Sequence, residues 1–230
     1  MESWLNILSG MEWNDEVKNI VLLTIKLAFC STFISTILGV LLGLLLEQAE
    51  FPGKRVVVRI NRTLMGIPPV VVGLLVYLML MRRGLLGEWG ILFTFQAMVI
   101  AQMIIITPIV CGMVYQTASR TAPQIRNFAK SMGASRWQTF CLLIKELRND
   151  LYFVFVAGFG RSVSEVGAVM IVGGNIQYKT RTMTTAISLM RNKGDYGEAI
   201  TMGVLLLAIS FTIQWLADFL RREEKSDEND

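Results

Sequence analysis

Long hydrophobic runs separated by short polar stretches dominate the chain. Five of the runs are long enough to cross a bilayer, which takes about 20 helical residues. They lie at residues 20–46, 64–81, 91–114, 151–173 and 199–219. Prolines interrupt the second and third runs, which membrane helices tolerate where neighbouring groups satisfy the freed carbonyls. The pattern predicts an all-α membrane protein with about five transmembrane helices.

Three stretches outside the runs have patterns of their own. Residues 1–16 lack the basic start of a signal peptide and predict an external segment at the membrane interface, held there by Trp4, Leu5, Ile7, Leu8 and Trp13. Residues 174–196 are too polar to span and predict a short amphipathic helix that folds back toward the membrane on Met183, Ala186, Ile187 and Met190. Residues 221–230 form an acidic cytoplasmic tail, which leaves 17–220 as the membrane domain.

Composition supports a membrane protein, and the placement of basic residues orients it. Charged residues make up 17% of the chain and hydrophobic residues 53%, whereas about a quarter of a soluble domain is charged. Of the 22 Lys and Arg residues, thirteen fall on one side of the predicted spans and seven on the other. Because cytoplasmic loops carry the excess of these residues, the N-terminus is expected outside and the C-terminus in the cytoplasm. The thirteen are Lys54, Arg55, Arg59, Arg62, Arg120, Arg126, Lys130, Arg136, Lys145, Arg148, Arg221, Arg222 and Lys225.

The residue types that carry most catalytic chemistry are missing or scattered. The chain has no His, which is the commonest general base and a common zinc ligand. Cys30, Cys111 and Cys141 lie far apart in the sequence, and we expect them to be small apolar packing residues. No P-loop sequence occurs. We therefore expect a non-catalytic chain without a metal site or a bound cofactor, and no nucleic-acid partner.

The predicted cytoplasmic loop at 121–148 has the strongest local signals. A first helix is expected to begin near residue 121, with Pro123 in its first turn, and to end in a left-handed cap at Gly133. Ser135 opens a second helix, with Gln138 completing a capping box. Such a unit is either a rigid knob for a cytoplasmic partner or a linker lying on the bilayer. The apolar face expected on the second helix consists of Trp137, Phe140, Cys141, Ile144 and Leu147.

Part of this loop resembles the EAA loop of ABC-importer permeases, in which E-A-A-x-x-x-G is followed after nine residues by I-x-L-P. Asn127 and Phe128 stand at the E-A positions, and Leu143 to Glu146 replace I-x-L-P. In that family the loop docks on the ATPase subunit. The resemblance therefore implies that the coupling residues here are Asn127, Phe128, Ala129, Gly133, Ala134, Ser135, Arg136 and Trp137.

Other segments narrow the resemblance to one branch of these permeases. The sequence GFGRSVSEVGA at 158–168 and Gly194-Asp195-Tyr196 before the last span are similar to signatures of the molybdate, sulfate and tungstate permeases. The proline-containing segment 67–74 and the region 101–109 look closest to tungstate permeases. The resemblance covers residues 15 to 220 and implies a type I importer permease fold in the plasma (inner) membrane of a prokaryote.

The resemblance also implies partners and a transported substrate. The chain is expected to form a homodimer in the lipid bilayer, with two cytoplasmic ATPase subunits that bind ATP and Mg and an extracytoplasmic oxyanion-binding protein. Tungstate is the expected anion, and molybdate and sulfate are alternatives. A stand-alone channel or secondary transporter is a more distant alternative, because the five runs show no convincing internal repeat of the kind common in such proteins.

Two features stand out within the fourth hydrophobic run. Arg161 and Glu165 lie at i and i+4, where side chains on a helix face the same way and neutralise each other. A structural pair is favoured, because a strong anion site would slow release; contact with an anion in transit is the alternative. Gly160, Ser164 and Ala168 repeat at four-residue spacing, which suits either close helix packing or the lining of a pathway.

Overall fold

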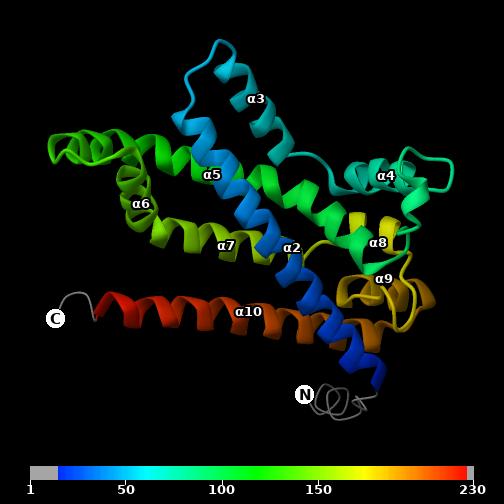
Figure 1. Ribbon diagram of the computed structural model, residues 1–230. Coiled ribbons are helices and arrows are strands. Elements are labelled where there is room, and N and C mark those ends of the chain that lie inside the picture. The colour runs from blue at the N-terminus through cyan, green and yellow to red at the C-terminus, as the bar shows by residue number, and fades with distance from the viewer. Residues whose placement is uncertain (1–14, 227–230) are drawn as a thin grey trace.

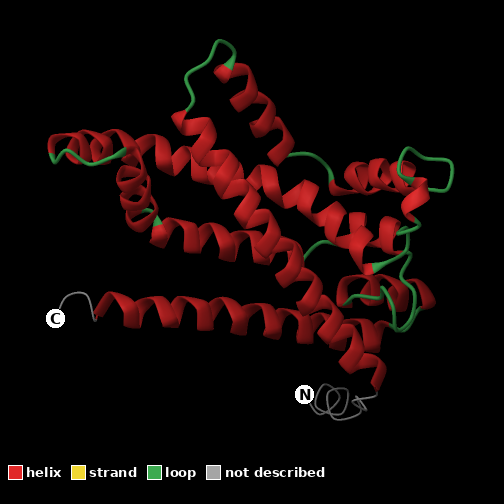
Figure 2. Cartoon of the chain, in the orientation of Figure 1, coloured by secondary structure: helices red, strands yellow, loops and turns green. Residues whose placement is uncertain are grey.

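A computed structural model describes the backbone of residues 15–226 and the side chains of 15–215 and 219. The interfacial segment expected on Trp4, Leu5, Ile7, Leu8 and Trp13 therefore lies outside the described residues. Within them every regular element is a helix (Figure 2). In chain order these are α2 (Asp15–Gln48), α3 (Lys54–Met65), α4 (Pro69–Leu80), η1 (Gly87–Trp89), α5 (Phe95–Ser131), α6 (Arg136–Glu146), α7 (Arg148–Val163), α8 (Gly167–Gly173), α9 (Met183–Lys193) and α10 (Tyr196–Ser226).

The described helices supply between three and five candidate membrane spans. Three are continuous: α2, α5 and the Tyr196–Trp215 part of α10. Two more are bent pairs, α3 with α4 and α7 with α8, which meet at angles of 99° and 59°. The expectation of an all-α membrane protein is confirmed, and the expected five spans are reached when each bent pair counts as one.

The interruption by prolines expected in the second run is present, whereas the break in the fourth run was not expected. Between α3 and α4, Pro68 is extended, with φ −62° and ψ 125°, because a residue that precedes another proline is sterically excluded from the helical region. In the fourth run the helix ends at Val163 and resumes only at Gly167. The 12 residues of α4 reach only about 18 Å, too short to span the bilayer alone.

The third span, α5, is much longer than its hydrophobic run. It has 37 residues and contains both Pro108 and Pro123, so it extends about 55 Å and projects well beyond a hydrocarbon core of about 30 Å. The prediction of a new helix starting near residue 121 is therefore wrong. Pro123 frees only the carbonyl of Ser119, and both residues are exposed, whereas Ala118 and Ala122 are fully buried. Packing on that buried face keeps the helix continuous.

The centre of the fold is the crossing of α2 and α5. Gly39 and Gly43 permit it: a Cβ built on Gly39 would lie 2.5 Å from Val110 Cγ1, and one on Gly43 would lie 2.9 Å from the Cys111 carbonyl oxygen. Small residues at such a crossing let the helices touch along their backbones. The adjoining hydrophobic cluster joins α2, α5, α6 and α7 through Leu44, Ile106, Val110, Val114, Ala118, Ala122, Leu143, Leu147 and Val154.

The short amphipathic helix predicted in the polar segment between the fourth and fifth spans is present. Its helix, α9, buries Met183 and Ala186 completely, with Ile187 and Met190 half-buried against α2 and α10. Thr182 caps α9 and exchanges hydrogen bonds with Thr185. The segment is therefore a structured cover over one end of the helices.

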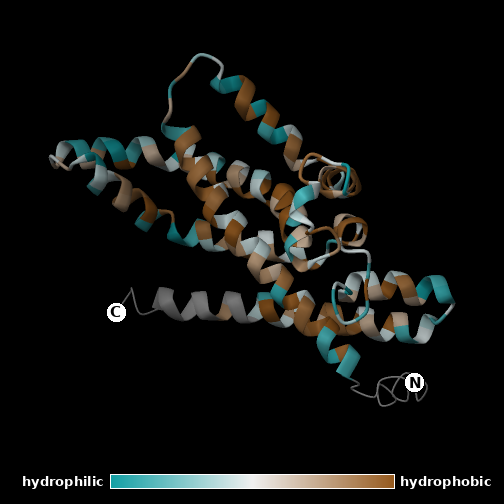
Figure 3. Cartoon of the chain, turned by 45° about the vertical axis from the view of Figure 1, so that its right-hand side comes forward, coloured by the Kyte–Doolittle hydropathy of each residue, from teal (hydrophilic) through white to brown (hydrophobic). Residues whose placement is uncertain are grey.

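The long helices give the molecule two ends (Figure 1). The turn between α5 and α6 lies at one end, together with the later part of α10, and α2 begins at the opposite end, near α9. Hydrophilic residues gather on α3, at the α5–α6 turn and at the turn between α9 and α10, whereas the helices between are mainly hydrophobic (Figure 3). This distribution matches an apolar belt with a polar region at each end.

Candidate functional site

The turn between α5 and α6 is a rigid unit, named here the α5–α6 knob (residues 127–137). Gly133 is left-handed, with φ +72°, and the N–H of Ala134 donates to the carbonyl of Ala129 at 2.9 Å. Ser135 and Gln138 form the reciprocal capping box that the sequence predicts, at 2.8 and 3.3 Å. The helix–Gly–helix unit and its two caps are confirmed, with the correction that its first helix is the end of α5.

The knob exposes large apolar side chains. Phe128, Met132 and Trp137 are 60%, 72% and 71% exposed, and the Trp137 ring stacks on Phe140 with centroids 5.7 Å apart. Such a cluster on a polar end of the molecule is typical of an interaction surface. The remaining knob residues divide into buried Ala129, half-buried Ala134, and exposed Asn127, Lys130, Ser131, Gly133, Ser135 and Arg136.

The predicted apolar face of α6 is only partly right. Trp137 and Cys141 are exposed, whereas α6 packs through Leu143, with Phe140 and Ile144 beside it. The face that contacts the rest of the protein is thus rotated toward Leu143, and this rotation leaves Trp137 free of the core.

An ion pair fixes the base of the knob to the end of α2. The Arg126 guanidinium contacts the Glu47 carboxylate, whose side chain is 8% exposed, and Lys54 Nζ donates to the Glu47 carbonyl at 2.9 Å. Sequence reasoning missed this link, because 79 positions separate its partners. The acidic residue at the end of the first hydrophobic run was the available signal.

A second missed feature is a polar cluster buried among α2, α5 and α7. The Oε1 atom of Gln102 accepts from Ser31 Oγ at 2.6 Å and from Ser162 Oγ at 2.8 Å, and its Nε2 donates to the Ser162 carbonyl at 3.1 Å. All three side chains are at most 3% exposed. The cluster pins the last turn of α7, and its sequence signal was polar residues inside hydrophobic runs.

The structure brings Arg161 and Glu165 together across the α7–α8 break. Arg161 Nη2 lies 3.9 Å from Glu165 Oε2, with the Arg161 side chain 42% exposed and that of Glu165 6% exposed. Glu165 Oε1 accepts from the N–H of Ala168 at 3.1 Å, and the Glu165 carbonyl accepts from Thr184 Oγ1 at 2.9 Å. The expected ion pair is present, but only Arg161 is in a helix.

The small residues at 160, 164 and 168 do not form one helix face, because the break lies between them. Gly160 lies close to the Gln214 side chain of α10, and Ala168 packs against Gly73 of α4. Ser164 is exposed, and its hydroxyl donates to the Arg161 carbonyl at 3.0 Å. Close packing is thus observed for Gly160 and Ala168, each against a different helix.

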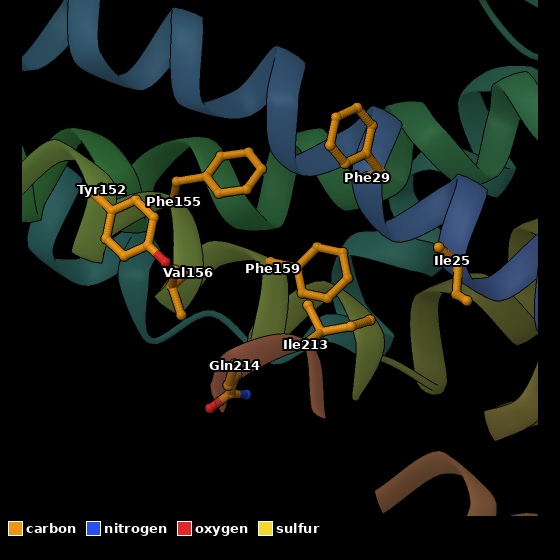
Figure 4. Close-up of a pocket in the computed structure, with 8 residues that line it drawn as sticks. All are labelled: Ile25, Phe29, Tyr152, Phe155, Val156, Phe159, Ile213 and Gln214. Carbon is orange, nitrogen blue, oxygen red and sulfur yellow. The ribbon is translucent and has the colours of Figure 1, made fainter. Parts of the chain in front are cut away.

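An apolar hollow of about 220 Å³ lies between α2, α7 and α10 (Figure 4). Its lining is Ile25, Phe29, Tyr152, Phe155, Val156, Phe159, Ile213 and Gln214. A charged anion loses its hydration there without gaining matching partners, which is unfavourable. The hollow therefore does not fit an oxyanion.

At the opposite end from the knob, an acidic residue ties down the segment before α9. Glu16 Oε1 accepts from Arg181 Nη1 at 2.6 Å, and Glu16 Oε2 accepts from Gln177 Nε2 at 2.7 Å. Arg181 is thus neutralised within the protein. The exposed bases of this end include Lys179, Arg191 and Lys193.

The described part of the chain thus combines membrane-length helices with a rigid apolar knob at one polar end. Within the part of the chain that the structure describes, no three His, Cys, Asp or Glu side chains lie together in a way that could hold a metal ion. The chain belongs to the family of binding-protein-dependent transport system inner membrane components, whose family pattern matches residues 35–225. It is therefore a permease-type, multi-pass protein of a prokaryotic inner membrane.

Individual relatives agree with this family. The chain is 37% identical over 213 residues to the tungstate uptake system permease protein TupB of Peptoclostridium acidaminophilum, covering 93% of each chain. It is 28% identical over 225 residues to the molybdenum transport system permease protein ModB of Escherichia coli K12, covering 94% of this chain and 96% of that one.

A solved structure agrees with the fold. A chain of a bacterial alginate ABC transporter, in complex with alginate pentasaccharide-bound periplasmic protein, matches with a TM-score of 0.79 over 96% of this chain and 86% of its own length. Because the sequence identity is 16%, this match concerns the fold alone.

Proposed function

We propose that this chain is the permease subunit of an ATP-driven importer for a tetrahedral oxyanion, and that the anion is tungstate. The identity of 37% to a tungstate permease, against 28% to a molybdenum permease of similar coverage, supports tungstate over molybdate. The chain itself performs no bond chemistry in this role. It supplies a path across the membrane, and a separate subunit hydrolyses ATP.

The α5–α6 knob is the proposed docking site for that ATPase subunit. The exposed cluster of Phe128, Met132 and Trp137 on a helix end fixed by Gly133 and the Ser135 cap is the observation that carries the proposal. A rigid apolar projection fits a groove on a partner and transmits the partner's movement without bending. The proposed orientation places the knob in the cytoplasm, where ATP is available.

The remaining partners follow from the same role. An extracytoplasmic binding protein delivers the anion at the α9 end, where the exposed bases attract acidic groups on its surface. A second copy of the chain completes the path between the two subunits. These assignments rest on the family's general description as binding-protein-dependent and on the two-ended distribution of polar residues.

Trp137→Ala tests the docking site. With its proposed ATPase partner co-expressed, we expect the variant to retain at most a tenth of the ATPase that co-purifies with the wild type in mild detergent. The substitution removes an aromatic anchor of the kind that dominates interfaces. The matched control is Trp89→Ala, which removes a 60% exposed tryptophan at the other end of the molecule. Equal ATPase retention by both variants would refute docking at the knob.

Uptake by cells that express the whole system tests the anion. We expect ATP-dependent accumulation of labelled tungstate. A tenfold excess of unlabelled tungstate should suppress this accumulation, whereas the same excess of sulfate should not. Preferential competition by molybdate would assign the chain to molybdate instead. Tungstate flux that persists after ATP depletion would support the alternative of a channel.

A further inference from the structure

Arg161 occupies a position that a lipid environment does not explain. It follows Arg148, the first residue of α7, by thirteen positions and precedes Gly173, the last residue of α8, by twelve, so it lies near the middle of the broken span. Its side chain is nevertheless 42% exposed. An exposed arginine at that depth is strongly unfavourable against hydrocarbon, and such residues face protein or water instead.

The exposed side chains beside Arg161 lie on one face of α7 and of Ser164, the residue that caps its end. Phe153, Ala157 and Ser164 are exposed, and together with Arg161 they follow the i, i+4, i+8, i+11 spacing of a helix face. The face is named here the Arg161 face. Beyond the aromatic Phe153 at its start, the face carries a small residue, a charge and a hydroxyl, and this central part suits water better than lipid.

The partner of Arg161 leaves most of the guanidinium free. Glu165 directs one carboxylate oxygen to the Ala168 N–H at 3.1 Å, and the other lies 3.9 Å from Arg161 Nη2, beyond hydrogen-bonding distance. A guanidinium has five N–H donors. The pair is thus a dipole with its negative end buried and its positive end turned outward.

The turn that carries Arg161 is held rigidly. The adjacent Ser162 is locked by Gln102 and Ser31, and the Glu165 carbonyl is fixed by Thr184. Because these bonds all lie on the inner side of the break, they point the Arg161 side chain away from the core. The donors are therefore preorganised toward the open side.

We propose that Arg161 is the oxyanion-contacting residue of the transport path, and that the Arg161 face lines that path. Glu165 is a positioning residue that partly offsets the charge, so that the anion is attracted and then released. The inference rests on the proposed function for the identity of the anion. It goes further in naming the helix face and the side chain that meet it.

Thiol accessibility tests the face without any transport measurement. In the full chain, with Cys30, Cys111 and Cys141 replaced by Ala, the variants Ala157→Cys and Ser164→Cys are treated in membranes with a water-soluble, negatively charged methanethiosulfonate. We expect both to react at least tenfold faster than Leu207→Cys, a control at a 71% exposed apolar position on α10. Equal rates would overturn the assignment of the face, whatever the transporter carries.

Charge substitutions test Arg161 in the complete transporter, with tungstate as the probe. We expect Arg161→Gln to lower uptake at least tenfold while ATP hydrolysis stimulated by the loaded binding protein stays within twofold of the wild type. Arg161→Lys should retain more uptake than Arg161→Gln. The double variant R161Q/E165Q should be as defective as R161Q.

The double variant separates the path role from a structural ion pair. If Arg161 only neutralises Glu165, removing both charges restores uptake, and the proposal is wrong. If R161Q does not assemble, the proposal is still tested by the uptake of R161K compared with that of the double variant, and by the thiol reaction rates. A wild-type complex that carries no oxyanion would instead refute the proposed function, and the accessibility result would stand by itself.

Discussion

Single residues determine how closely the helices of this protein approach. Gly73 of α4 shows this best: a Cβ there would lie 2.7 Å from the Cα atom of Ala168, a backbone atom that cannot rotate away. The contact joins α4 to α8 just beyond the two helix breaks. It thereby holds together the two bent spans.

Gly73→Ala is therefore expected to destabilise the protein by about 1–3 kcal/mol, the usual cost of overpacking. Gly203→Ala is the matched control, since a Cβ on Gly203 meets no atom within 4 Å and alanine favours a helix. The midpoint of thermal unfolding in detergent measures both. A Gly73→Ala midpoint at or above that of Gly203→Ala would contradict the close contact.

Sequence rules succeeded where neighbouring residues determine the structure. The left-handed Gly133 and the Ser135 cap depend on backbone geometry within a few positions, so they could be predicted together with the knob. The Gln102 cluster could not, because its members lie 60 and 71 positions from Gln102. Such contacts depend on which helix faces meet, and hydrophobic runs alone carry no such information.

The boundaries of the helices differ from those of the hydrophobic runs that predicted them. The runs predicted which segments enter the membrane, but their edges missed the polar half of α5, and α3 was not predicted at all. The 12 residues of α3 include no buried residue, but Val56, Val57, Ile60 and Leu64 recur at helical spacing. This amphipathic pattern was an available signal that the prediction missed. Pro68 and Pro69 marked the break in the second run, and the mostly polar stretch from Arg161 to Glu165 marks the place of the unpredicted break in the fourth.

The polar half of α5 depends on its link to α2. Arg126→Gln should accelerate amide hydrogen exchange at residues 121–131 by up to about fivefold, because a partly exposed ion pair contributes about 1 kcal/mol at most. Lys130→Gln, at an exposed position of the same segment, is the control and should leave exchange unchanged. Similar exchange rates in the two variants would show that Glu47 does not hold the segment.

For the whole molecule, the knob end is predicted to face the cytoplasm. The fold puts the knob and the later part of α10 at one end and the start of α2 at the other (Figure 1), as the distribution of basic residues requires. That agreement fixes which segments share a side. The sidedness itself remains a prediction from the excess of Lys and Arg.

Cys141 provides the measurement, since it is exposed on α6 at the knob end. A membrane-impermeant maleimide should label Cys141 in inside-out vesicles and leave it unlabelled in right-side-out ones. Lys179→Cys in a Cys141→Ala background is the control and should show the reverse. Labelling of Cys141 in right-side-out vesicles would invert the topology and remove the knob from the reach of an ATPase.

The unbroken length of α5 has a mechanical consequence. One rod of about 55 Å joins the knob at Ser131 to the opposite end at Phe95, with no flexible loop to absorb displacement. A tilt of about 10° around its midpoint displaces each tip by about 5 Å, in opposite directions, for a rod of this length. A small angular movement at one membrane face therefore produces a displacement at the other face that is about the width of an inorganic anion.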